Sequence, residues 1–249
     1  MRWVCLGAIA WFAFAGVVPA IAAVSFSENA PVAGSALDLF RTAYESRNTW
    51  DDDFPGYESE VSVRYEGQVY LGRVEVYPDG RVDILNLENP DVQQLIKTEL
   101  ASVYQQRTRV PFAAEHGASA FEWVSRDRPT VIRERAPNSD ITYRVQDGKI
   151  VGEDRTRGGE AISTDVLGFI QPAGGYVATD FRVTERDPAT RALLAQREYR
   201  DYYMKISKYY LLHRRTIRQS EGAPLMPKAL PDISLIFSAV HALPEDRDR

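Results

Sequence analysis

Cysteine is nearly absent from this sequence, since the 249 residues contain only Cys5. It lies in the apolar run at the N-terminus, so the rest of the chain has no thiol for a disulfide or a sulfur-ligated metal. Histidine is also scarce. His116, His213 and His241 fall in three separate segments without the spacing of a metal site. We therefore predict no metal site and no cofactor.

Catalytic motifs are missing as well. Ser119 lies in the segment GASAF, which lacks the second glycine of a nucleophile elbow. The acidic run Asp51–Asp53 lacks the alternating ligands of a calcium loop. We predict no catalytic residue and favour a protein that is not an enzyme. A hydrolase would be reconsidered if His116 or His213 lay beside a serine or a carboxylate pair.

There is no excess of positive charge. The chain has 30 basic and 35 acidic residues and a formal net charge of -5. A nucleic-acid-binding domain would need a basic surface, so nucleic acid is not an expected partner. Hydrophobic residues make up 44% and charged residues 26% of the chain, which is ordinary for a globular domain.

Long apolar runs are confined to the N-terminus. Arg2 precedes an uncharged stretch that ends in small residues, so residues 1–22 are expected to be a signal peptide. An uncleaved membrane anchor is the alternative. The expected divisions are a linker at 23–34, a single domain at 35–243 and a disordered tail at 244–249. A cleaved signal would place the protein in the periplasm or an equivalent lumen.

Alternating hydrophobic and polar residues predict an antiparallel meander at residues 57–65, 70–76 and 82–84. Capping and helical spacing predict helices at about 35–47 and 90–106. Residues 110–117 are expected to be a loop or short crossover, and 162–170 are ambiguous between strand and short helix. Further strands are expected at 121–124, 130–133, 141–145, 149–151, 177–184, 193–206, 209–218 and 233–243, of which 193–206 is long. The predicted fold is α+β, a curved antiparallel sheet like a half-barrel, with two main helices covering its concave side.

Large apolar side chains on these strands could enclose an apolar ligand or simply form a core. The predicted lining consists of Tyr57, Val61, Val63, Tyr70, Val74, Val76, Ile84, Trp123 and Tyr143. Basic residues on the hairpin at 199–218 could meet an anionic lipid headgroup or could be an ordinary solvated face. The headgroup candidates are Lys205, Arg214 and Arg215.

Two stretches resemble known families. Leu39–Trp50 followed by Phe54–Tyr57 is similar to the opening of an uncharacterised family, domain of unknown function 3386. That resemblance implies no activity, ligand or site. More loosely, Asp201–Tyr203, Tyr209–Arg215 and Ser234–Phe237 look like the last strands of the Lol-type lipoprotein carriers, half-barrels that shelter acyl chains. Such a likeness of fold does not by itself transfer a function.

Two functional hypotheses remain open from the sequence. In the first, an exported, non-enzymatic protein holds a lipid or acyl chain in the cavity of its curved sheet. In the second, the sheet is filled by its own side chains, and the protein is an interaction or assembly factor. It would then dock on a membrane-associated protein partner through an edge strand or the basic hairpin.

Overall fold

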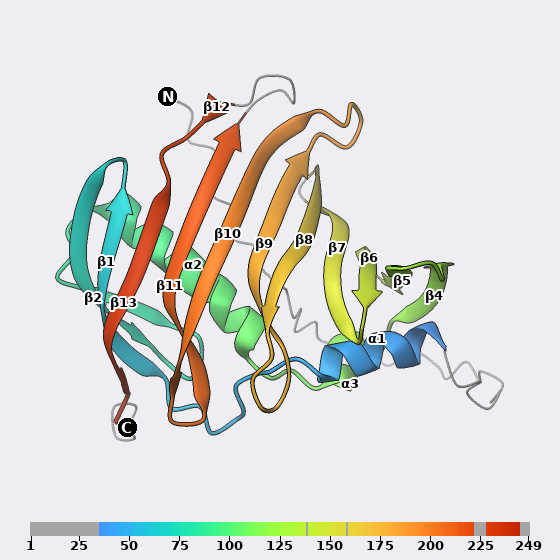
Figure 1. The fold of residues 1–249 in the computed structure, drawn as a ribbon, viewed down its shortest axis with the longest axis horizontal. Helices are drawn as coiled ribbons and strands as arrows, with labels where there is room; N and C mark the ends of the chain where they lie inside the picture. The colour runs from blue at the N-terminus through green and yellow to red at the C-terminus, as the bar shows by residue number, and fades with distance from the viewer. Residues whose placement is uncertain (1–34, 138, 158, 222–227, 245–249) are drawn as a thin grey trace.

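The structure is a computed structural model that describes residues 35–137, 139–157, 159–221 and 228–244. The expected signal peptide, the linker and most of the expected tail lie outside these residues. The described strands form a single sheet (Figure 1), and every strand pair in it is antiparallel. The predicted α+β class and antiparallel sheet are confirmed.

The strands are β1 (Tyr57–Tyr65), β2 (Gln68–Val76), β3 (Val82–Leu85), β4 (Ala120–Ser125), β5 (Thr130–Ala136), β6 (Ser139–Gln146), β7 (Lys149–Arg157), β8 (Glu160–Ile170), β9 (Val177–Arg186), β10 (Leu193–Ile206), β11 (Tyr209–Glu221), β12 (Lys228–Ala229) and β13 (Ile233–Ala242). Their order across the sheet is β3-β2-β1-β13-β11-β10-β9-β8-β7-β6-β5-β4, and β12 pairs with β11. Almost all strands that are adjacent in the sheet are also consecutive in the sequence. The exception is β13, which lies between β1 and β11 and joins the meander to the other strands.

Three helices accompany the sheet: α1 (Ala36–Glu45), α2 (Pro90–Arg107) and α3 (Phe112–His116). The first two confirm the predicted helices, and local capping explains where they begin. The Ser35 hydroxyl accepts a hydrogen bond from the Asp38 amide at 3.1 Å. The Asn89 side chain accepts one from Val92 at 3.1 Å. Among the described helices, none combines the length and hydrophobicity needed to cross a bilayer.

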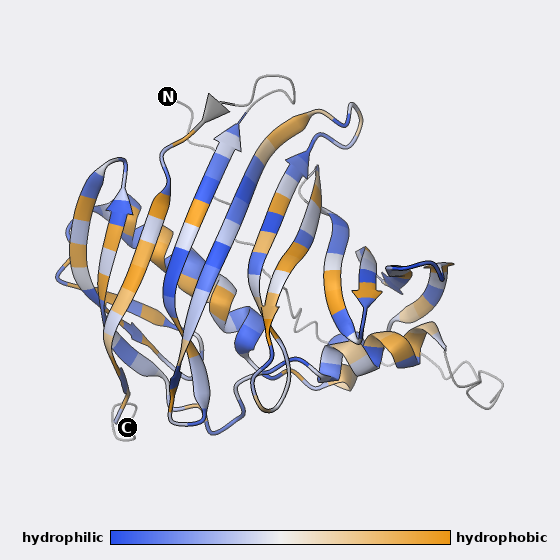
Figure 2. Cartoon of the chain, viewed as in Figure 1, coloured by the Kyte–Doolittle hydropathy of each residue, from blue (hydrophilic) through white to orange (hydrophobic). Residues whose placement is uncertain are grey.

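The core has two parts. Under α2, the apolar side chains of its buried stripe pack against β1, β2, β13, β11, β10 and β9. At the other end of the sheet, α1 and α3 pack against β5, β6 and β7. Figure 1 shows α2 crossing behind β13, β11 and β10, and Figure 2 shows hydrophobic and hydrophilic residues alternating along the strands. We call the face of β1, β2, β10, β11 and β13 that packs on α2 the inner face, and the opposite face the outer face.

Candidate functional site

The edge of the sheet at β2 is only partly covered. The four residues of β3 pair with Arg73–Val76 of β2, and the register ends at Arg73 opposite Leu85. Among the residues that the structure describes, 68–72 therefore have a neighbouring strand, β1, on one side alone. The strand ends there because Asn86 has a φ of 59°, a left-handed conformation that does not continue a strand. The chain then turns into α2. A free strand edge of five residues remains.

The register shows which backbone groups face this free edge. The Tyr77 amide donates to the Arg81 carbonyl at 2.9 Å, on the β3 side of the hairpin. In an antiparallel strand the N–H and C=O of one residue point to the same side, and successive residues alternate. The pairing of β2 with β1 has no bulge, so Val69 and Leu71 also direct their backbone groups toward the β3 side. They lie beyond the end of β3.

This geometry predicts alternating amide protection in the isolated protein. The amides of Val69 and Leu71 should exchange with solvent at least about tenfold faster than those of Tyr70 and Gly72, which face β1. Hydrogen exchange followed by NMR measures each amide separately. Equal protection of all four amides would show that another group already covers this edge.

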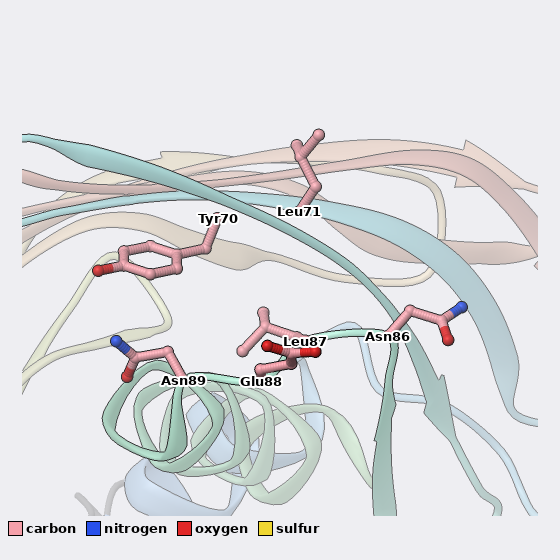
Figure 3. Close-up of a pocket in the computed structure, with 6 residues that line it drawn as sticks. All are labelled: Tyr70, Leu71, Asn86, Leu87, Glu88 and Asn89. Atoms are coloured by element: carbon pink, nitrogen blue, oxygen red, sulfur yellow. The ribbon is translucent and has the colours of Figure 1, made fainter.

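A hollow of 450 Å³ opens beside the free edge, between β2 and the start of α2. Its lining residues are Tyr70, Leu71, Asn86, Leu87, Glu88 and Asn89. Figure 3 shows Tyr70 extending over the start of α2 toward Asn89, whereas the Leu71 side chain points to the opposite side of the strand.

The floor of the hollow depends on Gly72. A Cβ at this position would lie 2.9 Å from the Leu87 Cβ and 3.1 Å from the Leu85 carbonyl oxygen. Because glycine has no Cβ, Leu87 packs directly over the β2 backbone and is buried. The hollow is therefore apolar at its base and polar at its rim.

One carboxylate, that of Glu88, lines the hollow, and two others lie close to the same end of β2. Glu88 belongs to its lining, and Glu66 and Asp91 lie near Tyr65 at the same end of β2. Burial raises the pKa of the Tyr65 hydroxyl, and the charges of Glu66 and Asp91 raise it further. All three acidic residues are exposed to solvent. The exposed Glu88 carboxylate in the lining can pair with a cationic group that enters the hollow.

The opposite edge of the sheet, β4, differs in character. A register irregularity falls between Trp123 and Ser125. The carboxylate of Glu122 on the same strand forms an ion pair with Arg135, with Nη2 and Oε1 2.7 Å apart. Bulges and charged side chains are common devices that keep an edge strand from pairing with another chain. Residues 68–72 of β2 contain no proline, charge or bulge.

The residues predicted to line a cavity lie mainly in the two cores. Tyr57, Val61, Val63, Val74 and Val76 are at most 2% exposed and pack in the core that contains α2. Tyr70 and Ile84 pack against the same core. Trp123 and Tyr143 belong to the core under α1. Tyr70 is the one residue of this predicted set that lines the described hollow.

The three predicted headgroup residues do not form one surface. Arg215 is 0% exposed. Its Nε and Nη2 donate to the two Asp201 carboxylate oxygens at 2.8 and 2.6 Å, and its Nη1 donates to Glu99 Oε2 at 2.8 Å. The prediction for Arg215 is therefore wrong, because consecutive residues of a strand face opposite sides of the sheet. Its neighbour Arg214 is exposed on the outer face, and Lys205 is exposed farther along the hairpin.

His116 lies beside carboxylates but not in a catalytic arrangement. Its Nδ1 is 2.7 Å from Glu134 Oε1, and aromatic rings of Phe40, Tyr44 and Phe112 surround the buried imidazole. Burial acts to raise the pKa of Glu134, but hydrogen bonds from His116 and Ser119 outweigh it and lower that pKa. Among the described residues no hydrogen bond joins the Ser119 hydroxyl to the His116 imidazole, so the serine is not activated as a nucleophile.

The second histidine considered for a hydrolase, His213, has its Nδ1 2.7 Å from the Phe237 carbonyl oxygen. This contact is to backbone and gives it no serine or carboxylate partner. His213 therefore gives the hydrolase hypothesis no support. His116 does have two carboxylates nearby, at 2.7 Å (Glu134) and 3.9 Å (Glu115), but it lies in a buried aromatic cluster.

The chain is similar to one protein family and to one solved structure. The family described as "Protein of unknown function (DUF3386)" matches residues 33–236. No curated protein matches the chain. A solved structure, "Crystal structure of MucB in complex with MucA(peri)", is similar at 7% sequence identity with a TM-score of 0.22. The match covers 84% of this chain and 99% of that chain.

Proposed function

Since the chain belongs to the DUF3386 family, whose description assigns no activity, we propose a function from the geometry of the β2 edge. The protein is a non-enzymatic interaction protein that binds an extended segment of a partner protein. The segment adds as a strand to residues 68–72 of β2, in line with β3. Peptide recognition by strand addition uses backbone hydrogen bonds for affinity and adjacent hollows for side-chain specificity.

One observation carries this proposal. The same strand is paired on both sides at Arg73–Val76 and on one side at residues 68–72, and a hollow lies beside the unpaired part. The unpaired backbone groups of Val69 and Leu71 supply the hydrogen bonds, and the hollow supplies a place for a side chain. A filled core supports this function equally well, because binding at the edge needs no internal cavity.

The register of an added strand determines where its side chains lie. Residues opposite Val69 and Leu71 would contact those exposed apolar side chains on the outer face. A residue opposite Tyr70 would project over the hollow, toward Glu88 and Asn89. Because the Glu88 carboxylate lines the hollow, a lysine or arginine is favoured there, with its aliphatic stem along Tyr70 and Leu87. The partner segment is thus expected to alternate apolar, basic, apolar.

The proposal keeps three expectations from the sequence. The two main helices lie on the concave side of the sheet, which leaves the outer face and the edge for a partner. The protein is exported through a signal peptide at residues 1–22. Its partner is then a protein of the periplasm or lumen, associated with the membrane. The hypothesis of a lipid ligand has less support, because side chains of α2 already pack against the meander residues that were to line the cavity.

A single proline tests strand addition. Val69→Pro removes the backbone N–H that faces the free edge, where proline is tolerated because no β1 hydrogen bond is lost. Peptides should first be selected from a phage-displayed library of random linear peptides on the wild-type protein. We expect the selected peptides to share the apolar, basic, apolar pattern and to bind Val69→Pro at least about tenfold more weakly. Fluorescence anisotropy with labelled peptides measures the Kd.

The matched control is Val69→Ala, which also removes the valine methyl groups but keeps the N–H. It should retain most of the affinity. Equal losses in the two variants would mean that the peptides contact the side chain alone, and strand addition would be rejected. Strand addition would also be rejected if the selection enriched no peptide on the wild type relative to Val69→Pro. Native mass spectrometry of protein from its own cells would show a lipid-sized adduct if the lipid hypothesis held instead.

A further inference from the structure

Exposed side chains cross the outer face of the sheet in one row that begins at the free edge. We infer that the partner which adds a strand to β2 also covers this outer face, along the row from Leu71 to Tyr202. The inference rests on the proposed function and extends it from a strand edge to a two-part contact surface.

The row follows from strand register. Leu71 of β2 pairs with Ser62 of β1, and Ser62 pairs with Ile236 of β13. Ile236 pairs in turn with Arg214 of β11, which pairs with Tyr202 of β10. Directly paired residues in antiparallel strands direct their side chains to the same face. Five strands therefore place these five side chains side by side, although the residues are far apart in sequence.

Three of the five residues in the row have large hydrophobic side chains that are accessible to solvent. Leu71 is 68% exposed, Ile236 is 39% exposed and Tyr202 is 49% exposed. Val69, which precedes Leu71 on the same face, is 55% exposed. Ordinary outer faces of antiparallel sheets are polar, so several exposed apolar side chains in register indicate a contact surface.

Short hydroxyl side chains keep the surface low between the larger residues. Ser62 lies between Leu71 and Ile236 in the row, and Ser234 and Thr216 occupy the next row of the same face. Leu71 and Tyr202 therefore stand at the two ends of a shallow surface.

The charges on this face indicate the partner's chemistry. The Arg214 guanidinium lies 5.9 Å from the centre of the Tyr202 ring. Nearby cations have acidic partners. Arg73 forms an ion pair with Glu58, and Arg200 Nε lies 2.8 Å from Asp180 Oδ1. Within the part of the chain that the structure describes, Arg64 and Arg214 have no such carboxylate. Arginine and tyrosine are favoured anchors in protein interfaces.

These two arginines flank the apolar side chains. Arg64 pairs with exposed Val69, and Arg214 pairs with both Ile236 and Tyr202. A partner surface with an apolar strip and carboxylates at its sides would complement this arrangement. The expected partner therefore combines an edge segment of alternating apolar and basic residues with an acidic, partly apolar surface.

Leu71 makes the two areas continuous. Its backbone groups face the free edge, and its side chain begins the row on the outer face. A chain that pairs with Leu71 at the edge is therefore beside the first residue of the row, and Ile236 lies two strands farther across the same face. One partner can occupy both areas without crossing a gap.

Site-specific photo-crosslinking tests the inference in cells that make the full-length protein. The photoreactive amino acid p-benzoylphenylalanine is placed at Gln68 for the edge, at Tyr202 for the far end of the row, and at Leu167 as the control. Leu167 of β8 is an exposed apolar residue at 57% and lies outside the row. We expect the same partner protein in the adducts from positions 68 and 202, identified by mass spectrometry, and at least about tenfold less from position 167.

Two further variants sharpen the result. Val69→Pro should remove the adducts from both positions, because binding at the edge brings the partner to the row. Arg214→Glu should reduce the adduct from position 202 several-fold, because it would face the partner's carboxylates with a like charge. The adduct from position 68 should decrease less.

The outcomes separate the inference from the proposed function. An adduct from position 68 with none from position 202 above the control overturns the inference and leaves strand addition intact. No adduct from position 68 overturns strand addition and the shared-partner inference with it. A position-202 adduct that contains lipid, a second copy of this chain or a different protein also overturns the inference.

Discussion

Replacing Arg215 with alanine is expected to lower the free energy of unfolding by about 3–5 kcal/mol, because it would leave two buried carboxylates without their cation. Arg215 on β11 binds Asp201 on the neighbouring β10 and Glu99 on α2, and all three side chains are buried. Burial acts to lower the pKa of Arg215, but Asp201 and Glu99 outweigh it and raise that pKa well above its ordinary value. The guanidinium thus joins the helix to the sheet.

Urea unfolding followed by circular dichroism measures this change, provided that the slope with denaturant stays constant. Arg218→Ala is the matched control, since the Arg218 side chain is exposed and lies 3.6 Å from Asp232. It should change stability by less than about 0.5 kcal/mol. Removing all three charges together, as Arg215→Met with Asp201→Leu and Glu99→Leu, should be less damaging than Arg215→Ala. A loss below about 1 kcal/mol for Arg215→Ala would contradict the burial of the cluster.

The second large effect is a pH dependence due to Glu153. This carboxylate on β7 is buried, and burial raises its pKa from 4.5 to about 7, although Arg155 lies 3.2 Å away. The negative charge of Glu134 raises the pKa further. In the unfolded chain Glu153 would lose its proton near pH 4.5, whereas in the folded protein it keeps the proton until about pH 7. Its contribution to stability is therefore full at low pH and is lost as the pH rises from 4.5 to 7.

Glu153→Gln isolates this contribution, because glutamine has a similar shape and does not titrate. The stability of Glu153→Gln relative to the wild type should increase by about 3 kcal/mol between pH 4.5 and pH 8. Other groups, such as buried Glu99, titrate in both proteins and cancel in the difference. Asp140→Asn, whose carboxylate is exposed, serves as a control that should show no such trend. A pH-independent difference for Glu153→Gln would mean that Arg155 keeps the buried carboxylate ionised.

Local features of the fold could be predicted from the sequence because their causes are local. Alternation in residues 57–65 follows from one buried and one exposed face of β1. Ser35 and Asn89 mark helix starts because their side chains bond to backbone amides two or three residues later. The segment at 162–170 was ambiguous between strand and helix, and it forms β8 since it pairs along both sides. The short helix α3 was expected to be a loop or crossover.

The candidate site could not be predicted in the same way. The free edge exists because β3 ends at Leu85 and because none of the described strands lies beyond it, and both facts depend on the order of strands in the sheet. The meander itself was predicted, but the end of β3 depends on the left-handed backbone of Asn86. Glycine at position 72 was a visible signal, since a glycine within a strand often marks a close approach of other groups. Nothing local identified Leu87 as the group that approaches.

Arg215 shows how a pattern of composition can mislead. It was grouped with Arg214 because both are basic and close in sequence, yet the alternation of a strand separates adjacent residues onto opposite faces. The alternation of buried and exposed residues along β11 is also interrupted. Leu211 and Leu212 are consecutive and both buried, next to a register irregularity in the pairing with β10. Buried acids on β10 and α2, at positions 201 and 99, supply the counter-charge. A buried arginine is compatible with the sequence only once its distant partners are known.

The central place of β13 has a consequence for how the chain acquires its structure during synthesis. The first hairpins leave the ribosome early, but the strand that joins them to the remaining hairpins is among the last to emerge. Until residues 233–242 are available, β1 and β11 have no common neighbour, and the nascent polypeptide holds two unfinished sheets. The pairing of β1 with β13 joins segments far apart in sequence and is therefore slow to form, and the strand edges exposed during that delay are where a chaperone would be needed most.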